Sequence, residues 1–173
     1  MLGHAADAVS ERVASSRYVR PPGALPEPTF LAACTRCGEC ERVCPVNAIH
    51  PLSTQHGLAA GTPALDVDVT ACVMCVDMPC AAACPTDALD LPVERWRGIR
   101  MATIDIDEDR CIAFRDVDCG VCVRVCPGGT NAISLDASGR PVIGAACTGC
   151  GTCISACVTS PSSISAHPIG RKQ

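Results

Sequence analysis

The sequence has very few large side chains. Aromatic residues make up 2% of its 173 residues. They are Tyr18, Phe30, Trp96 and Phe114. The hydrophobic fraction of 48% comes largely from alanine and cysteine. A chain of this length with so few core-forming side chains has difficulty burying an ordinary hydrophobic core. Another group must therefore fill part of its interior.

The sequence also lacks a basic excess and long apolar runs. Its 14 Lys and Arg against 18 Asp and Glu give a net charge of −4, which argues against a nucleic-acid partner. No stretch approaches the ~18 apolar residues of a membrane helix, so we expect no membrane span. Residues 1–30 contain neither an apolar signal-peptide core nor a twin-arginine pair, and we therefore expect a cytoplasmic protein.

Signatures of catalysis are missing as well. The histidines show no metal-ligand spacing; they are His4, His50, His56 and His167. Neither a GxGxxG motif nor a Walker loop is present, so no nucleotide site is indicated. We expect a protein that has no catalytic site of its own.

Cysteine is what the sequence has in abundance, with 16 residues. This is about 9% of the chain, a level typical of secreted disulfide scaffolds. In a cytoplasmic protein, however, thiols stay reduced and disulfides are rare. The cysteines are therefore expected to bind metal.

The cysteines form four groups of four, which repeat at intervals of roughly 35–40 residues, as in an internal repeat. The groups are Cys34-x2-Cys37-x2-Cys40-x3-Cys44, Cys72-x2-Cys75-x4-Cys80-x3-Cys84, Cys111-x7-Cys119-x2-Cys122-x3-Cys126 and Cys147-x2-Cys150-x2-Cys153-x3-Cys157. Proline follows the last cysteine of the first three groups, and Val158 follows that of the fourth.

This spacing is typical of [4Fe-4S] clusters. Three thiolates on one tight loop hold three irons of a cubane, and the fourth cysteine ligates the other cluster of a two-cluster ferredoxin. Zinc sites usually pair two Cys-x-x-Cys knuckles across a longer stretch, which the first and fourth groups lack. All four groups are complete, so the sequence predicts iron–sulfur clusters with all sixteen cysteines as iron ligands.

The segments around the cysteines predict a repeated α+β unit. Alternating apolar and acidic residues at Leu65–Val69 and Thr103–Asp107, and the apolar run Pro141–Ile143, read as short strands. A short apolar stretch follows each group. The unit is thus strand, cysteine loop, short helix and strand, and two units make one ferredoxin-like module with two clusters.

Two segments lie outside this repeat. Residues 4–17 read as an amphipathic helix, and the proline-rich stretch 21–28 reads as an extended arm, either frayed or laid on a partner. We take 1–28 as this N-terminal segment and 168–173 as a tail. The basic stretch Arg95–Arg100, which contains Trp96, has two readings. It is either a loop that covers a cluster or a docking patch for a partner protein.

The chain resembles the four-cluster ferredoxin-type proteins of the periplasmic nitrate reductase and methylamine-utilisation systems. The resemblance rests on Val19–Ala24, Ala60–Pro63, Cys72–Cys80, the wide Cys111-x7-Cys119 spacing and Cys157-Val158. It implies four [4Fe-4S] clusters and electron transfer between a donor and a larger redox enzyme. Those exported relatives have a twin-arginine signal, which residues 1–30 lack. In lacking it, the chain is similar to the small electron-transfer subunits of tungsten- or molybdenum-dependent aldehyde oxidoreductases, and we favour that context.

By analogy with iron–sulfur subunits of molybdopterin dehydrogenases, the resemblance implies nested modules. Residues 29–60 with 140–167 would form an outer module, and 61–139 an inserted one. The implied ligand sets are Cys34, Cys37, Cys40 with Cys157; Cys147, Cys150, Cys153 with Cys44; Cys72, Cys75, Cys80 with Cys126; and Cys111, Cys119, Cys122 with Cys84. Sequential pairing, first group with second and third with fourth, is the rival.

The leading hypothesis is an electron-transfer subunit of an oxidoreductase complex. The alternatives are a diffusible ferredoxin, a quinol-linked ferredoxin of a nitrate reductase or methylamine system, and a scaffold whose clusters only hold the fold. End-to-end self-association into a chain of subunits is a further possibility.

Overall fold

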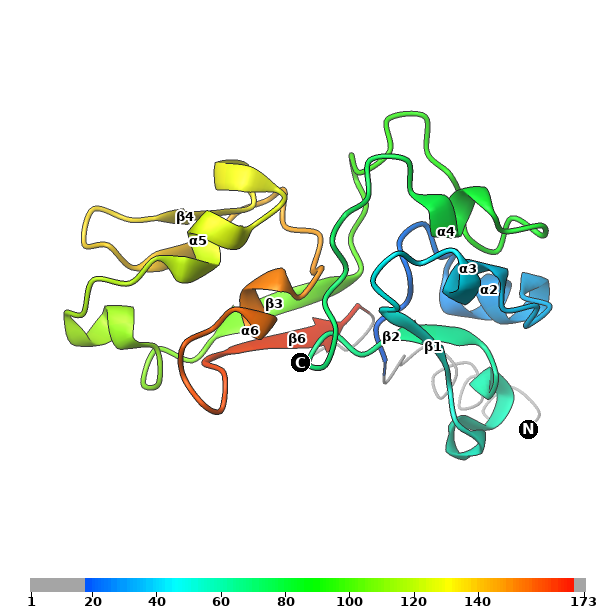
Figure 1. Cartoon of the computed structure of the whole chain (residues 1–173), viewed down its shortest axis with the longest axis horizontal. Coiled ribbons are helices and arrows are strands. Elements are labelled where there is room, and N and C mark those ends of the chain that lie inside the picture. Colours follow the sequence, from blue (N-terminus) through cyan, green and yellow to red (C-terminus); the bar gives the residue numbers. More distant parts are fainter. Residues whose placement is uncertain (1–17, 170–173) are drawn as a thin grey trace, which may run out of the picture.

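The computed structural model describes residues 18–169, which form two lobes that lie side by side (Figure 1). The elements of the first lobe are α2 (Glu27–Ala33), α3 (Glu39–Arg42), β1 (Ile49–Pro51), the 3-10 helix η1 (Thr54–Ala59), β2 (Pro63–Leu65) and α4 (Pro79–Ala82). Those of the second are β3 (Ala102–Ile106), η2 (Ile112–Arg115), α5 (Val121–Val125), η3 (Gly129–Asn131), β4 (Ile133–Leu135), β5 (Pro141–Ile143), α6 (Thr152–Ser155) and β6 (Ile164–Pro168).

The second lobe has the symmetric layout of two strand–loop–helix–strand units. β3 pairs with β6 in antiparallel fashion, with Ile104 opposite Ala166, and β4 pairs with β5. Along β3, Ala102 and Ile104 are buried while Thr103 and Asp105 are exposed. This confirms the half-buried strand that the alternating pattern predicts there.

The first lobe is a reduced version of the same layout. β1 and β2 form the inner antiparallel pair. The outer pair shrinks to one bridge between Ala24 and Leu89, flanked by bonds from Leu25 N–H to the Ala88 carbonyl and from Asp90 N–H to the Gly23 carbonyl. The strand predicted over Leu65–Val69 is wrong beyond Leu65, because the Asp66 carbonyl closes a turn by accepting bonds from Val69 and Thr70.

The lobes are successive segments of the chain, and this corrects the nested layout. α3 packs against α4 in the first lobe, and α5 packs against α6 in the second. The hydrogen bonds between β3 and β6 tie residues 102–106 to residues 164–168. The segment 140–167 therefore pairs with the segment that leads into the third cysteine group. Local strand and helix pairing produces two tandem modules.

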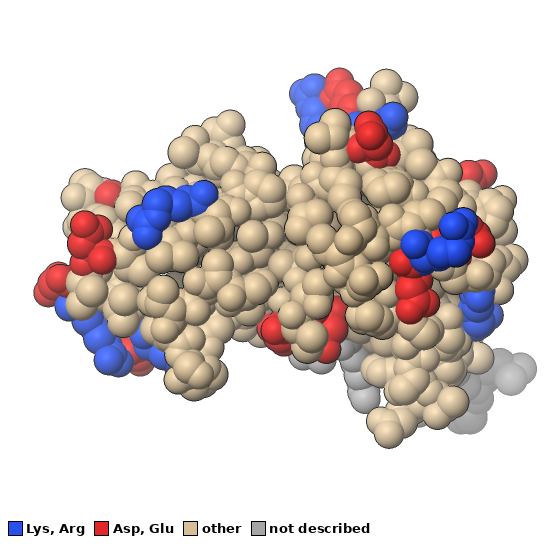
Figure 2. Space-filling model, viewed as in Figure 1, with Lys and Arg blue, Asp and Glu red and all other residues tan. Residues whose placement is uncertain are grey.

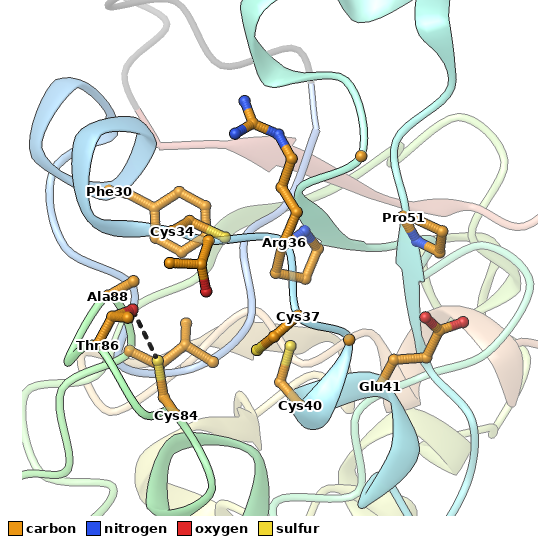
Figure 3. Close-up of a pocket in the computed structure, with 15 residues that line it drawn as sticks. Phe30, Cys34, Arg36, Cys37, Cys40, Glu41, Pro51, Cys84, Thr86 and Ala88 are labelled. Carbon is orange, nitrogen blue, oxygen red and sulfur yellow. Dashed lines mark hydrogen bonds between the residues drawn. The ribbon is translucent and has the colours of Figure 1, made fainter.

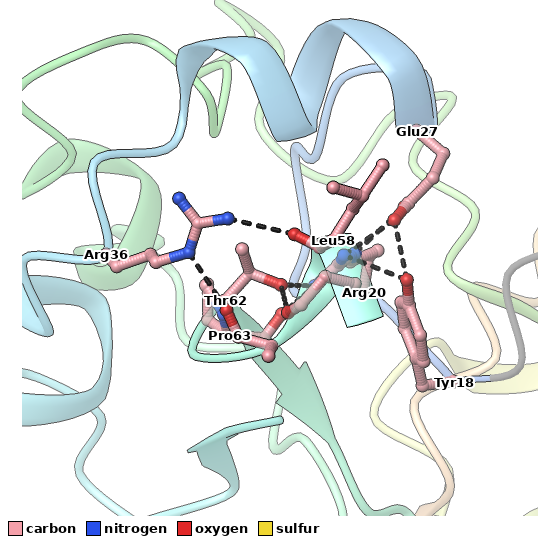
Figure 4. Close-up of polar contacts among 9 residues, drawn as sticks. Tyr18, Arg20, Glu27, Arg36, Leu58, Thr62 and Pro63 are labelled. Atoms are coloured by element: carbon pink, nitrogen blue, oxygen red, sulfur yellow. Dashed lines mark hydrogen bonds and ion pairs between the residues drawn. The ribbon is translucent and has the colours of Figure 1, made fainter. Parts of the chain in front are cut away.

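The proline-rich stretch is part of the first lobe, which corrects the arm predicted for residues 21–28. Pro21 and Pro22 are fully buried. The neighbouring Arg20 is 7% exposed and binds both carboxylate oxygens of Glu27, at 2.7 and 2.9 Å (Figure 4). Its guanidinium also donates to Thr62 Oγ1 at 2.9 Å and to the Pro63 carbonyl at 2.6 Å. This buried network fixes the segment against the lobe.

The two end segments of the predicted layout are only partly described. The predicted helix over 4–17 lies outside the described residues, as do residues 170–173 of the predicted tail. Pro168, where that tail was expected to begin, is the last residue of β6. Within residues 18–169, no helix has the length and hydropathy needed to cross a membrane.

Small side chains and cysteines make up much of the core. The buried residues include Ala48, Ala88, Ala102 and Ala132, together with the third cysteine of each group. Large side chains that are fully buried are few, and they include Phe30, Ile49 and Met78. This agrees with the composition, which predicts that another group shares the interior.

Candidate metal centres

Each cysteine group bends around a residue with a left-handed backbone. The residue two positions before the third cysteine has a positive φ and begins a short helix in every group; these residues are Gly38, Met78, Gly120 and Gly151. The third cysteine thus lies in the first turn of that helix. At Gly151, with φ of 85°, a side chain would be strained. Met78 adopts the same conformation without being glycine, so no glycine marks this turn in the second group.

Four cysteines from both groups of the first lobe line one cavity, which we call site A. They are Cys34, Cys37, Cys40 and Cys84. Figure 3 shows their side chains around one shared space, with Thr86 beside Cys84. Three of them come from the first group and one, Cys84, is the last cysteine of the second group. Cys37 is exposed, so this site lies near the surface.

Two further cavities repeat this arrangement. Site B is lined by Cys72, Cys75 and Cys80 of the second group with Cys44 of the first. Site C is lined by Cys147, Cys150 and Cys153 of the fourth group with Cys126 of the third. In both, three cysteines of one group meet the last cysteine of the other group in the same lobe.

The remaining four cysteines lie in the second lobe, and we call this set site D. Burial, together with the neighbouring Cys111 and Cys119, raises the pKa of the Cys122 thiol. The segment after Cys157 packs on the turn that holds Cys111: Asp107 N–H donates to the Ser163 carbonyl, and Cys111 N–H donates to the Asp107 carbonyl. Cys157 is thus on the chain segment that adjoins the third group.

These cavities correct the implied grouping of the cysteines. Cys84 lies with Cys34, Cys37 and Cys40, where Cys157 was expected. Cys44 and Cys126 have exchanged places relative to the nested sets, because each joins the other group of its own lobe. The physical reason is the packing of α3 on α4 and of α5 on α6, which brings together groups that are adjacent in sequence.

The donor sets fit a polynuclear cluster better than a single ion. Within residues 18–169, no three His, Cys, Asp or Glu side chains converge closely enough to hold one metal ion. The cysteine sulfurs instead surround shared cavities, as they do around a [4Fe-4S] cubane. Thiolate sulfur is a soft ligand suited to iron–sulfur clusters.

Burial raises the pKa of half of these thiols and so favours their protonated form until metal binds. It raises the pKa of Cys40 and Cys80 to about 11, and that of Cys72 and Cys153 to about 12. Neighbouring cysteines contribute in the same direction, since thiolates close to one another repel. Bound iron removes this penalty by taking up the negative charge.

Cys84 and Cys157 are the exceptions, because hydrogen bonds lower the pKa of both thiols. Burial raises the pKa of Cys157, but hydrogen bonds from Ser163 and Thr159 outweigh burial and lower the pKa to about 6. Thr159 Oγ1 lies 3.2 Å and Ser163 Oγ 3.4 Å from the sulfur. Sequence reasoning missed both hydroxyls. The signal was Val158 in place of proline, which marks a different chain path after this cysteine.

Trp96 closes one side of site B. Its indole N–H donates to the Cys75 carbonyl at 2.9 Å, and its ring lines the cavity together with Met78. The basic stretch around it is therefore a loop that covers a site, one of the two readings of Arg95–Arg100. Arg97 on the same loop is exposed and pairs with Glu94.

Two protein-family models match the chain, one for each lobe. Both are described as 4Fe-4S dicluster domains, and they match residues 33–88 and residues 103–158. Each match contains two complete cysteine groups. The boundary between the matches coincides with the boundary between the lobes.

Curated relatives align over most of the chain. The methylamine utilization ferredoxin-type protein MauM of Methylorubrum extorquens is 41% identical over 71% of this chain and 56% of its own length. The ferredoxin-type protein NapG of Escherichia coli is 40% identical over 71% of this chain and 54% of its own. The polyferredoxin-like subunit of the aliphatic sulfonate oxidoreductase of Pyrococcus furiosus is 33% identical over 55% and 50%. The chain thus spans little more than half the length of these relatives.

Proposed function

This chain is a ferredoxin-type iron–sulfur protein with two tandem 4Fe-4S dicluster domains, and we propose that it is the electron-transfer subunit of a larger redox complex. The two domains imply four [4Fe-4S] clusters. The family is one of electron carriers without catalysis of their own. The observation behind the proposal is that the four cysteine-lined sites follow one another through both lobes.

We assign one cluster to each site. The proposed ligand sets are Cys34, Cys37, Cys40 and Cys84 for site A; Cys44, Cys72, Cys75 and Cys80 for site B; Cys126, Cys147, Cys150 and Cys153 for site C; and Cys111, Cys119, Cys122 and Cys157 for site D. Site D follows from the internal repeat: the last cysteine of each group joins the other group of its lobe. When bound, the clusters supply reversible one-electron redox chemistry.

The protein holds the sites in the order A, B, C, D. Cys40 of site A has Cys80 of site B as an electrostatic neighbour, and Cys153 of site C has Cys122 of site D as another. Between the lobes, Cys72 of site B is hydrogen-bonded through its backbone to Cys150 of site C. Sites A and D therefore form the two ends at which partners would exchange electrons.

We propose that the larger partner is a tungsten- or molybdenum-dependent oxidoreductase of the aldehyde oxidoreductase type. The sulfonate oxidoreductase subunit among the relatives supports a role as a small subunit of an oxidoreductase. Charged residues of both signs are mixed at the two ends of the face in Figure 2, whose middle is largely uncharged.

We place the protein in the cytoplasm, where reduced thiols favour cluster assembly. Fractionation of cells that express the tagged chain tests that location.

A quinol-linked ferredoxin of a nitrate reductase or methylamine system is the second candidate, favoured by the NapG and MauM relatives. Anaerobic purification of the tagged chain with its bound proteins separates the two: a co-purifying subunit that oxidises aldehydes supports the first candidate, and a co-purifying protein that oxidises quinol supports the second. Absence of any stoichiometric partner points to a diffusible ferredoxin. Mass photometry of the same sample tests end-to-end association, which predicts a ladder of sizes.

Iron and sulfide analysis with anaerobic EPR tests the central proposal. Each site requires about four irons and four sulfides, and dithionite reduction should give the EPR signals of reduced [4Fe-4S] centres. Stoichiometric zinc with no signal on reduction would contradict the proposal. Rapid reduction by a dehydrogenase partner would exclude a purely structural role.

A further inference from the structure

The chain after Cys157 differs from the chain after the other three final cysteines. In the first three groups a proline follows, whereas here Val158 leads into a segment that wraps back over the sulfur. Two hydroxyl groups of this segment contact Cys157 Sγ: Thr159 Oγ1 at 3.2 Å and Ser163 Oγ at 3.4 Å.

The surrounding bonds orient both hydroxyls toward the sulfur. The Ser163 backbone N–H donates to Thr159 Oγ1 at 2.9 Å, which uses an acceptor position and leaves the Thr159 hydrogen for Cys157. Ser163 is 3% exposed, and within residues 18–169 its hydroxyl has the Cys157 sulfur as its partner. A ligand thiolate can only accept, so both hydroxyls donate to it.

The final cysteines of the other groups have fewer or longer hydroxyl contacts than Cys157, although backbone N–H groups also bond to Cys84 and Cys126. Cys44 Sγ accepts one bond, from Ala48 N–H at 3.3 Å. Cys84 Sγ has backbone hydrogen bonds from Thr86, Ala88 and Leu89, but the one hydroxyl near it, Thr86 Oγ1, lies 3.8 Å away. Elsewhere, Thr152 Oγ1 lies 3.5 Å from Cys150 Sγ, but it also donates to the Cys72 carbonyl. Its single hydrogen is therefore shared between two acceptors.

Hydrogen bonds to a ligand sulfur raise the reduction potential of its cluster. Reduction adds negative charge to the cluster and its sulfurs, and donors stabilise the reduced state more than the oxidised state. Carboxylates near site D, such as Asp116 and Asp118, act in the opposite direction. They are exposed, however, and are screened by water and salt, whereas the two hydroxyls touch the sulfur directly.

We infer that the hydroxyls of Thr159 and Ser163 make site D the highest-potential site, so that electrons enter at site A and leave at site D. This inference rests on the proposed function and adds a direction to it. Thr159 and Ser163 act as tuning residues through the Cys157 sulfur. The partner at site D is then the electron acceptor.

An EPR-monitored redox titration of the full holoprotein tests the inference with Ser163→Ala and Thr159→Val. In the wild-type protein, the first centre to be reduced should be the one that these variants affect. At a fixed potential, each variant should lower the ratio of reduced to oxidised cluster at this first centre by about tenfold. That change corresponds to about 59 mV for one electron. The other three centres should titrate unchanged.

Two further variants serve as controls. Ser162→Ala removes a hydroxyl that donates to the Ile164 carbonyl and does not touch a sulfur, so it should leave all four potentials unchanged. Thr159→Ser keeps the hydroxyl and should behave as wild type, which separates tuning from a packing defect.

A shift in a centre other than the first one reduced would overturn the inference, and so would the absence of a shift in both variants. In either case an iron content of four clusters would leave the proposed function standing. A chain that binds no reducible cluster would contradict both.

Discussion

The backbone N–H of Cys72 donates a hydrogen bond to the carbonyl oxygen of Cys150 across 2.9 Å. This bond joins the two lobes at the point where sites B and C approach each other. Thr152 reinforces it, since its hydroxyl donates back to the Cys72 carbonyl at 3.3 Å. Sites B and C are therefore linked by two hydrogen bonds, which give electrons a direct path between the lobes.

Gly151→Ala should weaken this contact between the lobes. A Cβ at Gly151 would lie 2.6 Å from the Val67 Cβ, so the lobes must shift apart. Overpacking of this kind costs about 1–3 kcal/mol, in addition to the strain of the left-handed backbone. We expect slower electron transfer between the lobes in stopped-flow reduction, with four clusters retained.

Gly139→Ala is the matched control for this variant. Gly139 has a similar positive φ of 77°, but a Cβ there meets nothing within 4 Å. It should show the backbone strain alone and leave the transfer rate unchanged. Equal slowing in both variants would show that the lobe contact does not limit transfer.

Paired substitutions distinguish the tandem from the nested grouping. Cys37→Ala with Cys84→Ala should remove one cluster, about four irons, because both cysteines belong to site A. Cys37→Ala with Cys157→Ala should remove two clusters, about eight irons. Iron and sulfide analysis of the purified variants measures both. The nested grouping predicts the reverse result, with two clusters lost from the first pair and one from the second.

The buried pair of Arg20 and Glu27 should stabilise the first lobe in a pH-dependent way. Burial alone would raise the pKa of Glu27, but the hydrogen bonds from Arg20 and Tyr18 hold it below 4.5. A lowered folded-state pKa gives stability that is fully present above about pH 4.5 and is lost as the pH falls through the folded value.

Glu27→Gln should therefore lower the unfolding free energy at pH 7 by about 3–5 kcal/mol, because it leaves Arg20 buried without its charge partner. The difference in unfolding free energy between the variant and the wild-type protein should narrow below pH 4.5. Anaerobic thermal unfolding followed by circular dichroism measures it. Glu94→Gln, which breaks the exposed pair with Arg97, should change little at either pH. A gap that stays constant with pH would contradict this account.

Trp96→Ala should open site B to solvent. The indole ring lines this cavity and its N–H binds the Cys75 carbonyl, so its removal exposes one cluster of four. We expect about four irons to be extracted faster by an anaerobic ferrous chelator. Trp96→Phe keeps the cover and should stay close to wild type, as should Arg97→Ala on the same loop. Uniformly faster release of all the iron would instead indicate general unfolding.

Several features of the fold could be predicted because they depend on local sequence. The alternating residues of 102–106 form a half-buried strand, and the small residues surround the cysteine sites. The spacing from the last cysteine to the next strand differs between groups, and the structure explains one case. After Cys126 the 3-10 turn η3, Gly129–Asn131, lengthens the path to Ile133.

Other features could not be predicted because distant contacts decide them. Leu65–Val69 alternates like a strand, yet β2 ends at Leu65 and the Asp66 carbonyl closes a turn. The prolines at 21 and 22 read as part of an extended arm, but they are buried beside the Arg20 network. Nothing in the local pattern reveals Glu27 or Thr62 as partners of that arginine.

The sequence by itself determined the kind of cofactor and the number of ligands, because a cysteine loop is set by spacing over about ten residues. Only the tertiary structure decided which last cysteine completes which site. Cys84 reaches Cys34, Cys37 and Cys40 because α3 and α4 pack together across a long stretch of chain. The tertiary structure also decided the hydrogen bond between Cys72 and Cys150 and the contacts of the Thr159 and Ser163 hydroxyls with the Cys157 sulfur. These contacts depend on how the chain folds back on itself, which the cysteine spacing does not encode.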